Sequence, residues 1–197
     1  HSEAAAERFR FTSQNEIGVA GANYGTDGQV LTSGGAGAAV AWEDVSSAKG
    51  LQNFVSTSTA AVSTHTTAFD IGDSIPQNDE GDELFTLAIT PAASDNTLII
   101  EATVVWSVDG AQRSIGIAIF QDTTANALAS TYAQKSDSAT PGVITIRHIM
   151  AAGTTSSTTF KLRVGANGDT LTVNGESGGR RLGGVASTSF NIWEVTV

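Results

Sequence analysis

The sequence predicts an all-β protein: an antiparallel β-sandwich of the jelly-roll type, preceded by a glycine-rich segment. Residues 97–108 carry the clearest signal, because apolar residues alternate with mostly polar ones and so define one buried and one wetter strand face. From residue 51 onward, about nine or ten short segments of this kind are separated by turn residues, a spacing typical of sandwiches and jelly rolls. Residues 14–42 hold many glycines instead. We therefore expect two parts, residues 1–50 and a sandwich over residues 51–197.

Composition and charge narrow the classes of function. The 197 residues include 10 Lys and Arg against 20 Asp and Glu, a formal charge of −10. An acidic surface repels nucleic acid and anionic membranes, so we expect neither as a partner, and no run has the length of a membrane-spanning helix. The chain has no cysteine, which excludes disulfides and thiolate metal sites. It also lacks an initiator Met, which predicts a fragment of a longer protein.

The first 50 residues have little capacity to form a core. Residues 2–8 have helix propensity, but so short a helix is marginal in water. Residues 14–42 contain seven glycines and only scattered apolar residues, too few for one copy to offset its ordering entropy. A flexible linker is one interpretation. A segment that folds only by winding with copies of itself is the other, and Val30, Leu31 and Trp42 favour it because linkers rarely carry such residues.

Residues 25–42 read GTDGQVLTSGGAGAAVAW. They resemble a segment of bacteriophage tail fibre proteins, G-x-x-G-Q-V-L-T-S-x-G-x-G-x-x-x-x-W, which lies between the fibre shaft and a distal domain. The preceding RFRFTSQNEIGVAG is similar to the shaft repeat R-x-x-F-T-x-x-G-x-x-G-I-G, with Asn15-Glu16 where a glycine is commoner. The resemblance covers about the first quarter of the chain. It implies a virion protein that acts outside the host cell, with residues 1–50 forming the end of an intertwined shaft and a joint at residues 43–50.

The rest of the chain divides into strands and turns. Residues 97–120 are expected to form a long hairpin whose turn is Asp109-Gly110, because both residues tolerate positive φ. Asn167-Gly168 is expected to form a second hairpin turn, leading into residues 171–173. The other expected elements are extended segments at 52–61 and 64–69, an acidic loop at 72–83, strands at 84–90, 127–134, 143–150 and 159–164, a turn at Asn174-Gly175 and a last strand at 189–197.

The last predicted strand is apolar on both faces. One face can cover its own core, and the other predicts contact with a symmetry mate; an ordinary buried central strand is the alternative. The arrangement resembles the trimeric jelly rolls of the tumour-necrosis-factor and complement globular-head type, whose last strand lies near the threefold axis. We therefore expect a homotrimer, with Trp42 packed at the junction between shaft and tip. The residues expected at the trimer interface are Trp42, Phe190, Ile192, Trp193 and Val195.

No set of residues predicts catalysis, so we expect no enzyme, no catalytic residue and no cofactor. The G-x-S-x-G, H-E-x-x-H and phosphate-loop motifs are absent. His65 has no acidic partner nearby in sequence, and His148 shares a strand face with apolar residues, which favours a packing role. Asp and Glu between residues 70 and 83 offer oxygen ligands, but they lack the EF-hand spacing, so a solvated loop is favoured over a calcium site and no metal is expected.

Arg180 and Arg181 are the candidates for receptor contact. They lie in the glycine-rich run GESGGRRLGG and could bind carboxylates of a surface glycan or balance acidic neighbours. In the tip fold that the chain resembles, the last strand returns toward the base, so residues 174–184 should lie at the far end.

The sequence thus predicts a non-enzymatic fibre tip. It would bind a bacterial surface receptor, either a polysaccharide or an outer-membrane protein, and would contact other virion proteins. Many weak contacts would be multiplied by copy number. Two alternatives remain open: a head fibre or other virion decoration with an assembly role, and a hydrolase or glycan-binding module of bacterial origin.

Overall fold

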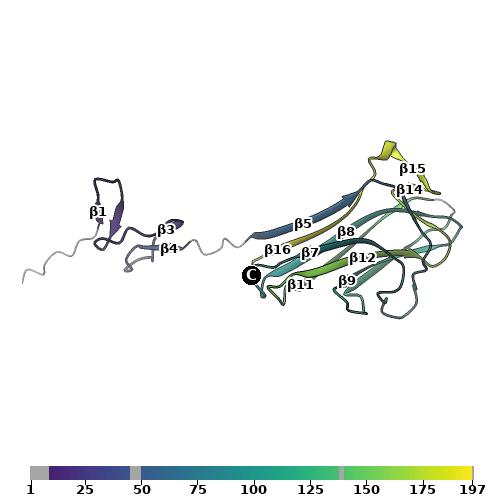
Figure 1. Cartoon of the computed structure of the whole chain (residues 1–197), viewed down its shortest axis with the longest axis horizontal. Helices are drawn as coiled ribbons and strands as arrows, with labels where there is room; N and C mark the ends of the chain where they lie inside the picture. The colour runs from purple at the N-terminus through teal and green to yellow at the C-terminus, as the bar shows by residue number, and fades with distance from the viewer. Residues whose placement is uncertain (1–8, 45–49, 138–139, 197) are drawn as a thin grey trace, which may run out of the picture. The chain divides into compact units, whose positions relative to one another are not determined.

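A computed structural model describes residues 9–44, 50–137 and 140–196, which form β-strands in two compact units, residues 1–48 and 49–197 (Figure 1). The helix expected over residues 2–8 lies outside the described residues, as does most of the joint at residues 43–50. Across the described part of the chain, no helix has the length and hydrophobicity needed to cross a bilayer.

The first unit consists of two small antiparallel hairpins. Strand β1 (Phe9–Phe11) pairs with β2 (Ile17–Val19), and β3 (Gln29–Thr32) pairs with β4 (Ala41–Asp44). Trp42 of β4 packs over Gly25, where φ is +71° and an added Cβ would lie 2.9 Å from the indole ring. Positive φ and lack of space both favour glycine at this position.

The first unit leaves most of its large apolar side chains in water. Val19 is buried, whereas the exposed set comprises Phe9, Phe11, Ile17, Val30 and Leu31. Burying apolar surface stabilises a protein by about 25 cal/mol per Å², and surface left in water does not contribute this stabilisation. One copy of this unit therefore carries more apolar surface than it can cover by itself.

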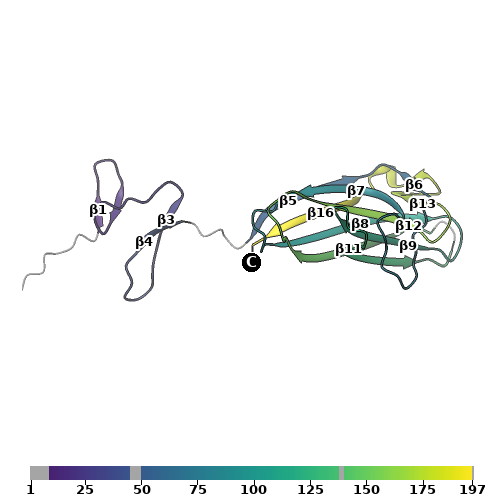
Figure 2. The same cartoon turned by 60° about the horizontal axis from the view of Figure 1, so that its bottom comes forward.

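The second unit is an antiparallel β-sandwich of the jelly-roll type, which confirms the predicted fold class (Figure 2). Its first sheet has the main strand order β5-β16-β8-β11, and its second has the order β10-β9-β12-β7. Successive main strands mostly alternate between the sheets. The first sheet contains β5 (Leu51–Thr59), β16 (Thr188–Val195), β8 (Thr97–Val108), β11 (Gly142–Ala151), and the short β13 (Leu171–Val173) and β6 (Ser63–His65). The second contains β7 (Asp82–Ile89), β12 (Thr158–Ala166), β9 (Ser114–Gln121) and β10 (Ala129–Gln134).

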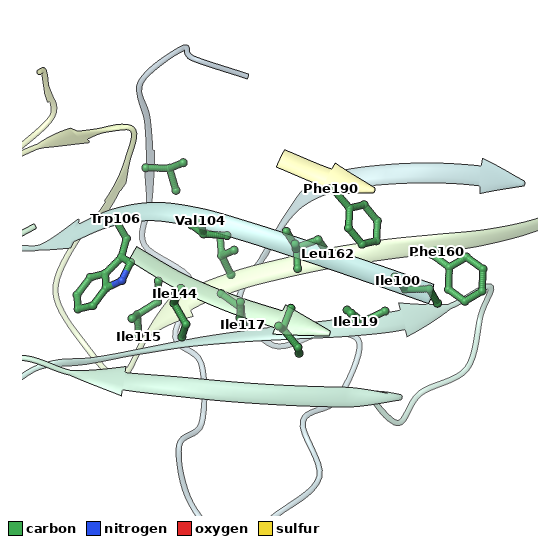
Figure 3. Packing of buried hydrophobic residues seen from close by; sticks show 14 of the residues in the cluster. Ile100, Val104, Trp106, Ile115, Ile117, Ile119, Ile144, Phe160, Leu162 and Phe190 are labelled. Atoms are coloured by element: carbon green, nitrogen blue, oxygen red, sulfur yellow. The ribbon is translucent and has the colours of Figure 1, made fainter. Parts of the chain in front are cut away.

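The core lies between the two sheets. Alternate residues of β8 that the sequence marked as apolar, among them Ile100 and Val104, are fully buried there. Figure 3 shows them facing Ile117 of β9 and Leu162 of β12 from the opposite sheet. The alternation in the sequence of β8 therefore identifies which of its residues belong to the core.

The predicted hairpin over residues 97–120 is wrong. Strand β8 pairs with β16, β11 and β13, whereas β9 pairs with β10 and β12 in the other sheet, so the Asp109-Gly110 connection crosses between sheets. Residues 114–120 are all buried. Phe69 and Phe120 cover the outer side of this region in a second small cluster. A strand that is covered on both faces belongs inside a sheet, and its alternation does not say which sheet.

The turn at Asn167-Gly168 is also not a hairpin. Strand β12 pairs with β7 and β9, whereas β13 pairs with β6 and β8, so this connection changes sheets as well. Turn residues mark where the chain reverses, but they do not determine whether the two flanking strands are hydrogen-bonded to each other.

Candidate functional site

Residues 174–187 form one end of the sandwich, which we call the distal end. Strand β16 runs antiparallel to β5, so the segment that precedes β16 lies opposite the point where β5 begins at Leu51 (Figure 1, yellow). The structure thus places this loop, relative to the start of the sandwich, where the sequence predicted it. Its parts are β14 (Gly175–Glu176), β15 (Gly179–Arg180) and the 3₁₀ turn η1 (Leu182–Gly184).

Arg180 and Arg181 are not equivalent. The Arg181 Nε donates to Oε2 of Glu176 across the β14–β15 ribbon, at 2.8 Å, so its charge is matched locally. Arg180 makes no ion pair within the described residues, and its aliphatic chain packs over Gly184, where an added Cβ would lie 2.9 Å from Cδ of the arginine. Of the two cations, only Arg180 is free to meet an external anion.

The base of the ribbon is fixed by buried hydrogen bonds. The Asn174 amide Nδ2 donates to the carbonyls of Thr59 (2.8 Å) and Ala61 (3.1 Å), and its Oδ1 accepts from the Thr188 hydroxyl (2.8 Å). The sequence suggested only a turn at Asn174, whose φ is indeed positive at 58°. Its role as the link between β5, β13 and β16 could not be found from local pattern, because its partners are far away in sequence.

Two exposed apolar side chains lie at the distal end. Leu182 is 77% exposed and Val185 is 79% exposed, on either side of two glycines. Both residues follow Arg180 within five positions. A cation beside exposed apolar side chains, on a loop held by a rigid base, is an arrangement suited to contact with another molecule.

A buried lysine lies at the same end. Lys135 is only 7% exposed, and its Nζ donates to the Val108 carbonyl. Burial lowers the pKa of the Lys135 ammonium, while the carboxylates of Asp109 and Glu176 oppose this shift. Ser177 of the ribbon donates to Asp109 at 3.1 Å, so the ribbon and this charge cluster are connected.

The interface residues predicted on the last strand separate into two groups. Phe190 and Ile192 are 0% exposed in a single chain and pack in the core, so the prediction that their side chains meet a neighbouring copy is wrong. Alternation places Trp193 and Val195 on the outer face instead. There the Trp193 ring stacks on Phe54 of β5 with centroids 5.4 Å apart.

The outer face around Trp193 includes apolar residues that sequence reasoning missed. Leu51 and Ile99 lie beside Trp193 and Val195 around a hollow of about 490 Å³. Each lies on the mostly polar side of its strand, and the register of three adjacent strands brings them together. Trp42 belongs to the first unit, where it faces Leu31.

His65 has an acidic partner that is distant in sequence, which local pattern could not reveal. Its Nδ1 lies 3.3 Å from Oδ2 of Asp82 at the start of β7, and its Nε2 lies 2.9 Å from the Ser63 hydroxyl. Burial would raise the pKa of the Asp82 carboxyl, but hydrogen bonds from Thr67 and the nearby imidazole leave that pKa below its usual value. The connectivity is that of a Ser-His-Asp triad. Here it also links an edge strand of one sheet to an edge strand of the other.

We expect the Ser63–His65–Asp82 set to be structural. Treatment with a fluorophosphonate probe should leave Ser63 unlabelled, because Ser63 and His65 belong to one short strand whose role is pairing with β13. Replacing His65 with Gln should instead lower the melting temperature. Intact-mass analysis of native and heat-denatured protein checks the first outcome. Labelling that disappears in a folded Ser63→Ala variant would contradict it and would identify a hydrolase.

The acidic loop uses its carboxylates to hold its own backbone. Asp70 accepts from the Gly72 amide (2.8 Å) and the Ser74 hydroxyl (3.1 Å), and Glu80 accepts from the amides of Asp70 (3.0 Å) and Gln77 (3.1 Å). Within the residues that the structure describes, no three His, Cys, Asp or Glu side chains are grouped to hold a metal ion. His148 is half-buried on the same strand face as Ile144 and Ile146, which agrees with a packing role.

Comparisons with known proteins complete the description. Residues 52–197 match the family model of the Pgp3 C-terminal domain. No curated protein matches the chain. The chain is similar in structure to infectious bursal disease virus, Gx strain (16% identity, TM-score 0.37), covering 86% of this chain and 41% of that one. It is also similar to the VP2 subviral particle of that virus, with 13% identity and a TM-score of 0.37, covering 86% of this chain and 43% of that one. A CBM4 structure is similar with 12% identity and a TM-score of 0.31, covering 58% of this chain and 76% of that one. The chain thus spans about two fifths of the viral proteins' length, and at these levels the matches do not bear on function.

Proposed function

Because the chain belongs to the Pgp3 C-terminal domain family through residues 52–197, we propose that this sandwich is a non-enzymatic adhesive tip, mounted on a bacteriophage fibre and binding the bacterial surface. The resemblance of residues 25–42 to tail fibre sequence supports the location in a virion. The partner would be a surface polysaccharide or an outer-membrane protein. The acidic chain makes nucleic acid an unfavourable partner.

The observation that carries the proposal is the construction of the distal end. Arg180, Leu182 and Val185 are exposed there, on a segment whose base is fixed by Asn174. Binding to such a loop requires little further ordering, which favours affinity. An unpaired guanidinium suits carboxylate or phosphate groups on a bacterial envelope.

We also propose that the protein is a homotrimer. Two independent surfaces support this: the apolar side chains that the first unit leaves exposed, and the outer sheet face around Trp193. Both present apolar area that a single copy leaves in water, and burying it between copies is favourable. Three tips on one fibre would multiply weak receptor contacts.

Adsorption measurements test the proposed function. Virions that carry Arg180→Ala should adsorb to host cells several-fold more slowly, and the defect should be larger at low salt because electrostatic attraction is less screened there. Arg181→Ala should have a smaller effect, because Arg181 is already paired with Glu176. Lys161→Ala, on β12 of the second sheet, is the matched control and should adsorb normally.

Two outcomes would count against this site. Normal adsorption of the Arg180→Ala, Arg181→Ala double variant would place the receptor contact elsewhere. A sharp fall in melting temperature with constant adsorption per folded protein would make the arginines structural. Normal adsorption combined with defective particle assembly would favour the decoration role.

A further inference from the structure

A second cleft lies on the side of the sandwich, away from the distal ribbon. It runs between the acidic loop and the edge strand β10 and comprises two adjoining hollows of about 420 and 140 Å³. Both hollows share Gly72, Ser74, Pro76 and Ser130 as lining residues, so they form one continuous depression. Its combined size is within the range of small-molecule sites.

Both walls of the cleft are held in place. The Ala127 amide donates to the Pro76 carbonyl at 3.0 Å, and the Asn78 amide donates to the Ala125 carbonyl at 2.8 Å, which fastens the loop to the segment before β10. Beneath it, Phe69 is buried at 2% exposure and packs with Phe120. The Asp70 hydrogen bonds to Gly72 and Ser74 fix the upper wall from within. The cleft is therefore a built feature with little freedom to collapse.

The lining combines three kinds of group. Tyr132 of β10 is 65% exposed and offers a flat aromatic face at one end. Ser74, Ser130 and Thr131 also line the cleft, and so does Asp73, whose carboxylate has no partner within the described residues. An aromatic face can pack on the C–H surface of a ring, while carboxylates accept strong hydrogen bonds from hydroxyls.

We propose that this cleft binds a neutral hexopyranose unit of a polysaccharide. A pyranose ring has an apolar C–H face for Tyr132 and several hydroxyl donors for Asp73 and the serine hydroxyls. Anionic sugars are disfavoured, because Asp70, Asp73 and Asp79 give this side a negative potential. A metal ion is disfavoured because only two carboxylates line the cleft. The site is separate from the distal end and would bind whether or not Arg180 contacts a receptor.

Saturation-transfer difference NMR on the full chain tests the proposal, with glucose, galactose and N-acetylglucosamine as probes and N-acetylneuraminic acid as an anionic comparator. We expect saturation transfer to at least one neutral sugar and little to the acid. Tyr132→Ala should weaken binding by about tenfold, as expected for loss of an aromatic contact. Tyr132→Phe should retain binding because the ring remains. Asp73→Asn should weaken it, and Asp95→Asn, an exposed Asp remote from the cleft lining, should not.

The melting temperature of each variant confirms that it is folded. The proposal is overturned if no neutral sugar receives saturation, if the signal persists in folded Tyr132→Ala, or if the acid binds best. Because sugar binding is measured without cells, its failure leaves the adsorption result on Arg180 unaffected. Conversely, normal adsorption of the arginine variants would not alter the sugar result.

Discussion

Replacing Trp193 with Arg is expected to convert the proposed trimer into monomers. Wild-type protein should sediment at three times the 20.2 kDa chain mass, and the variant at 20.2 kDa. Trp193 lies on the outer sheet face beside Leu51 and Val195, stacked on Phe54, which is 46% exposed. An arginine here removes the largest apolar side chain of the face and adds a charge in each copy to a hollow that Glu101 and Arg147 already line, which opposes association. The core beneath is formed by Phe190 and Ile192, so the single chain should still fold.

The matched control is Ala88→Arg on β7, an exposed position in the second sheet, which should remain trimeric. Sedimentation velocity at micromolar concentration separates the two results, and circular dichroism shows that each variant retains β-structure. A wild-type chain that sediments as a monomer would remove the proposed assembly. A Trp193→Arg variant that keeps the wild-type mass would move the interface to another face.

Replacing Glu194 with Ala should produce the largest loss of stability that we expect from a single change in the sandwich. Its side chain is 0% exposed, and Oε1 accepts from the amides of Ala92 (2.7 Å) and Ala93 (3.3 Å) and from the Asn96 amide Nδ2 (2.6 Å). Removal of the carboxylate leaves these donors without their acceptor, at a cost of about 3 kcal/mol or more. For a domain of this size, that lowers the melting temperature by roughly 6–12 °C.

Glu194→Gln separates hydrogen bonding from charge. All three bonds are made by Oε1, whereas the buried Oε2 has no partner among the described residues, so an amide can keep the three bonds. This variant should therefore melt much closer to wild type than Glu194→Ala does. Asp95→Ala, exposed in the same loop, controls for loss of a carboxylate. Thermal unfolding must be compared at one protein concentration, because association raises apparent stability. Equal melting of Glu194→Ala and wild type would show that the loop does not depend on this anchor.

The fold class and the buried face of most strands could be predicted from the sequence, because strand alternation is a local property. The residues of β8 illustrate this: every predicted inward position from Leu98 to Val104 is fully buried. The pairing of strands could not be predicted in the same way. Asp109-Gly110 and Asn167-Gly168 have the composition of hairpin turns, yet both connect different sheets. Sheet assignment depends on contacts that are distant in sequence.

In the candidate sites too, local features could be predicted from the sequence, whereas contacts between distant residues could not. The glycine-rich loop with Arg180 was identifiable because its composition differs from the strands around it. The pairing of Arg181 with Glu176, and the approach of Asp82 to His65, depend on how the chain folds back. The side cleft could not be predicted from the sequence because its two walls are about 50 residues apart in the chain. Tyr132 taken alone has the pattern of an ordinary exposed aromatic residue on an edge strand.

The pairing of β5 with β16 gives the sandwich a definite response to mechanical load. If the sandwich is held at its distal end, as the proposed function requires, it is pulled through Leu51 at one end of β5 and through Thr188 at the opposite end of β16. These strands are adjacent and antiparallel, so the two forces point along the strands and away from each other. The hydrogen bonds between them run across the strands. Tension therefore shears the whole ladder at once instead of opening it one bond at a time. In the proposed fibre tip, the first and last strands of the sandwich would therefore carry the load between the point where the fibre would attach and the surface that would meet the cell.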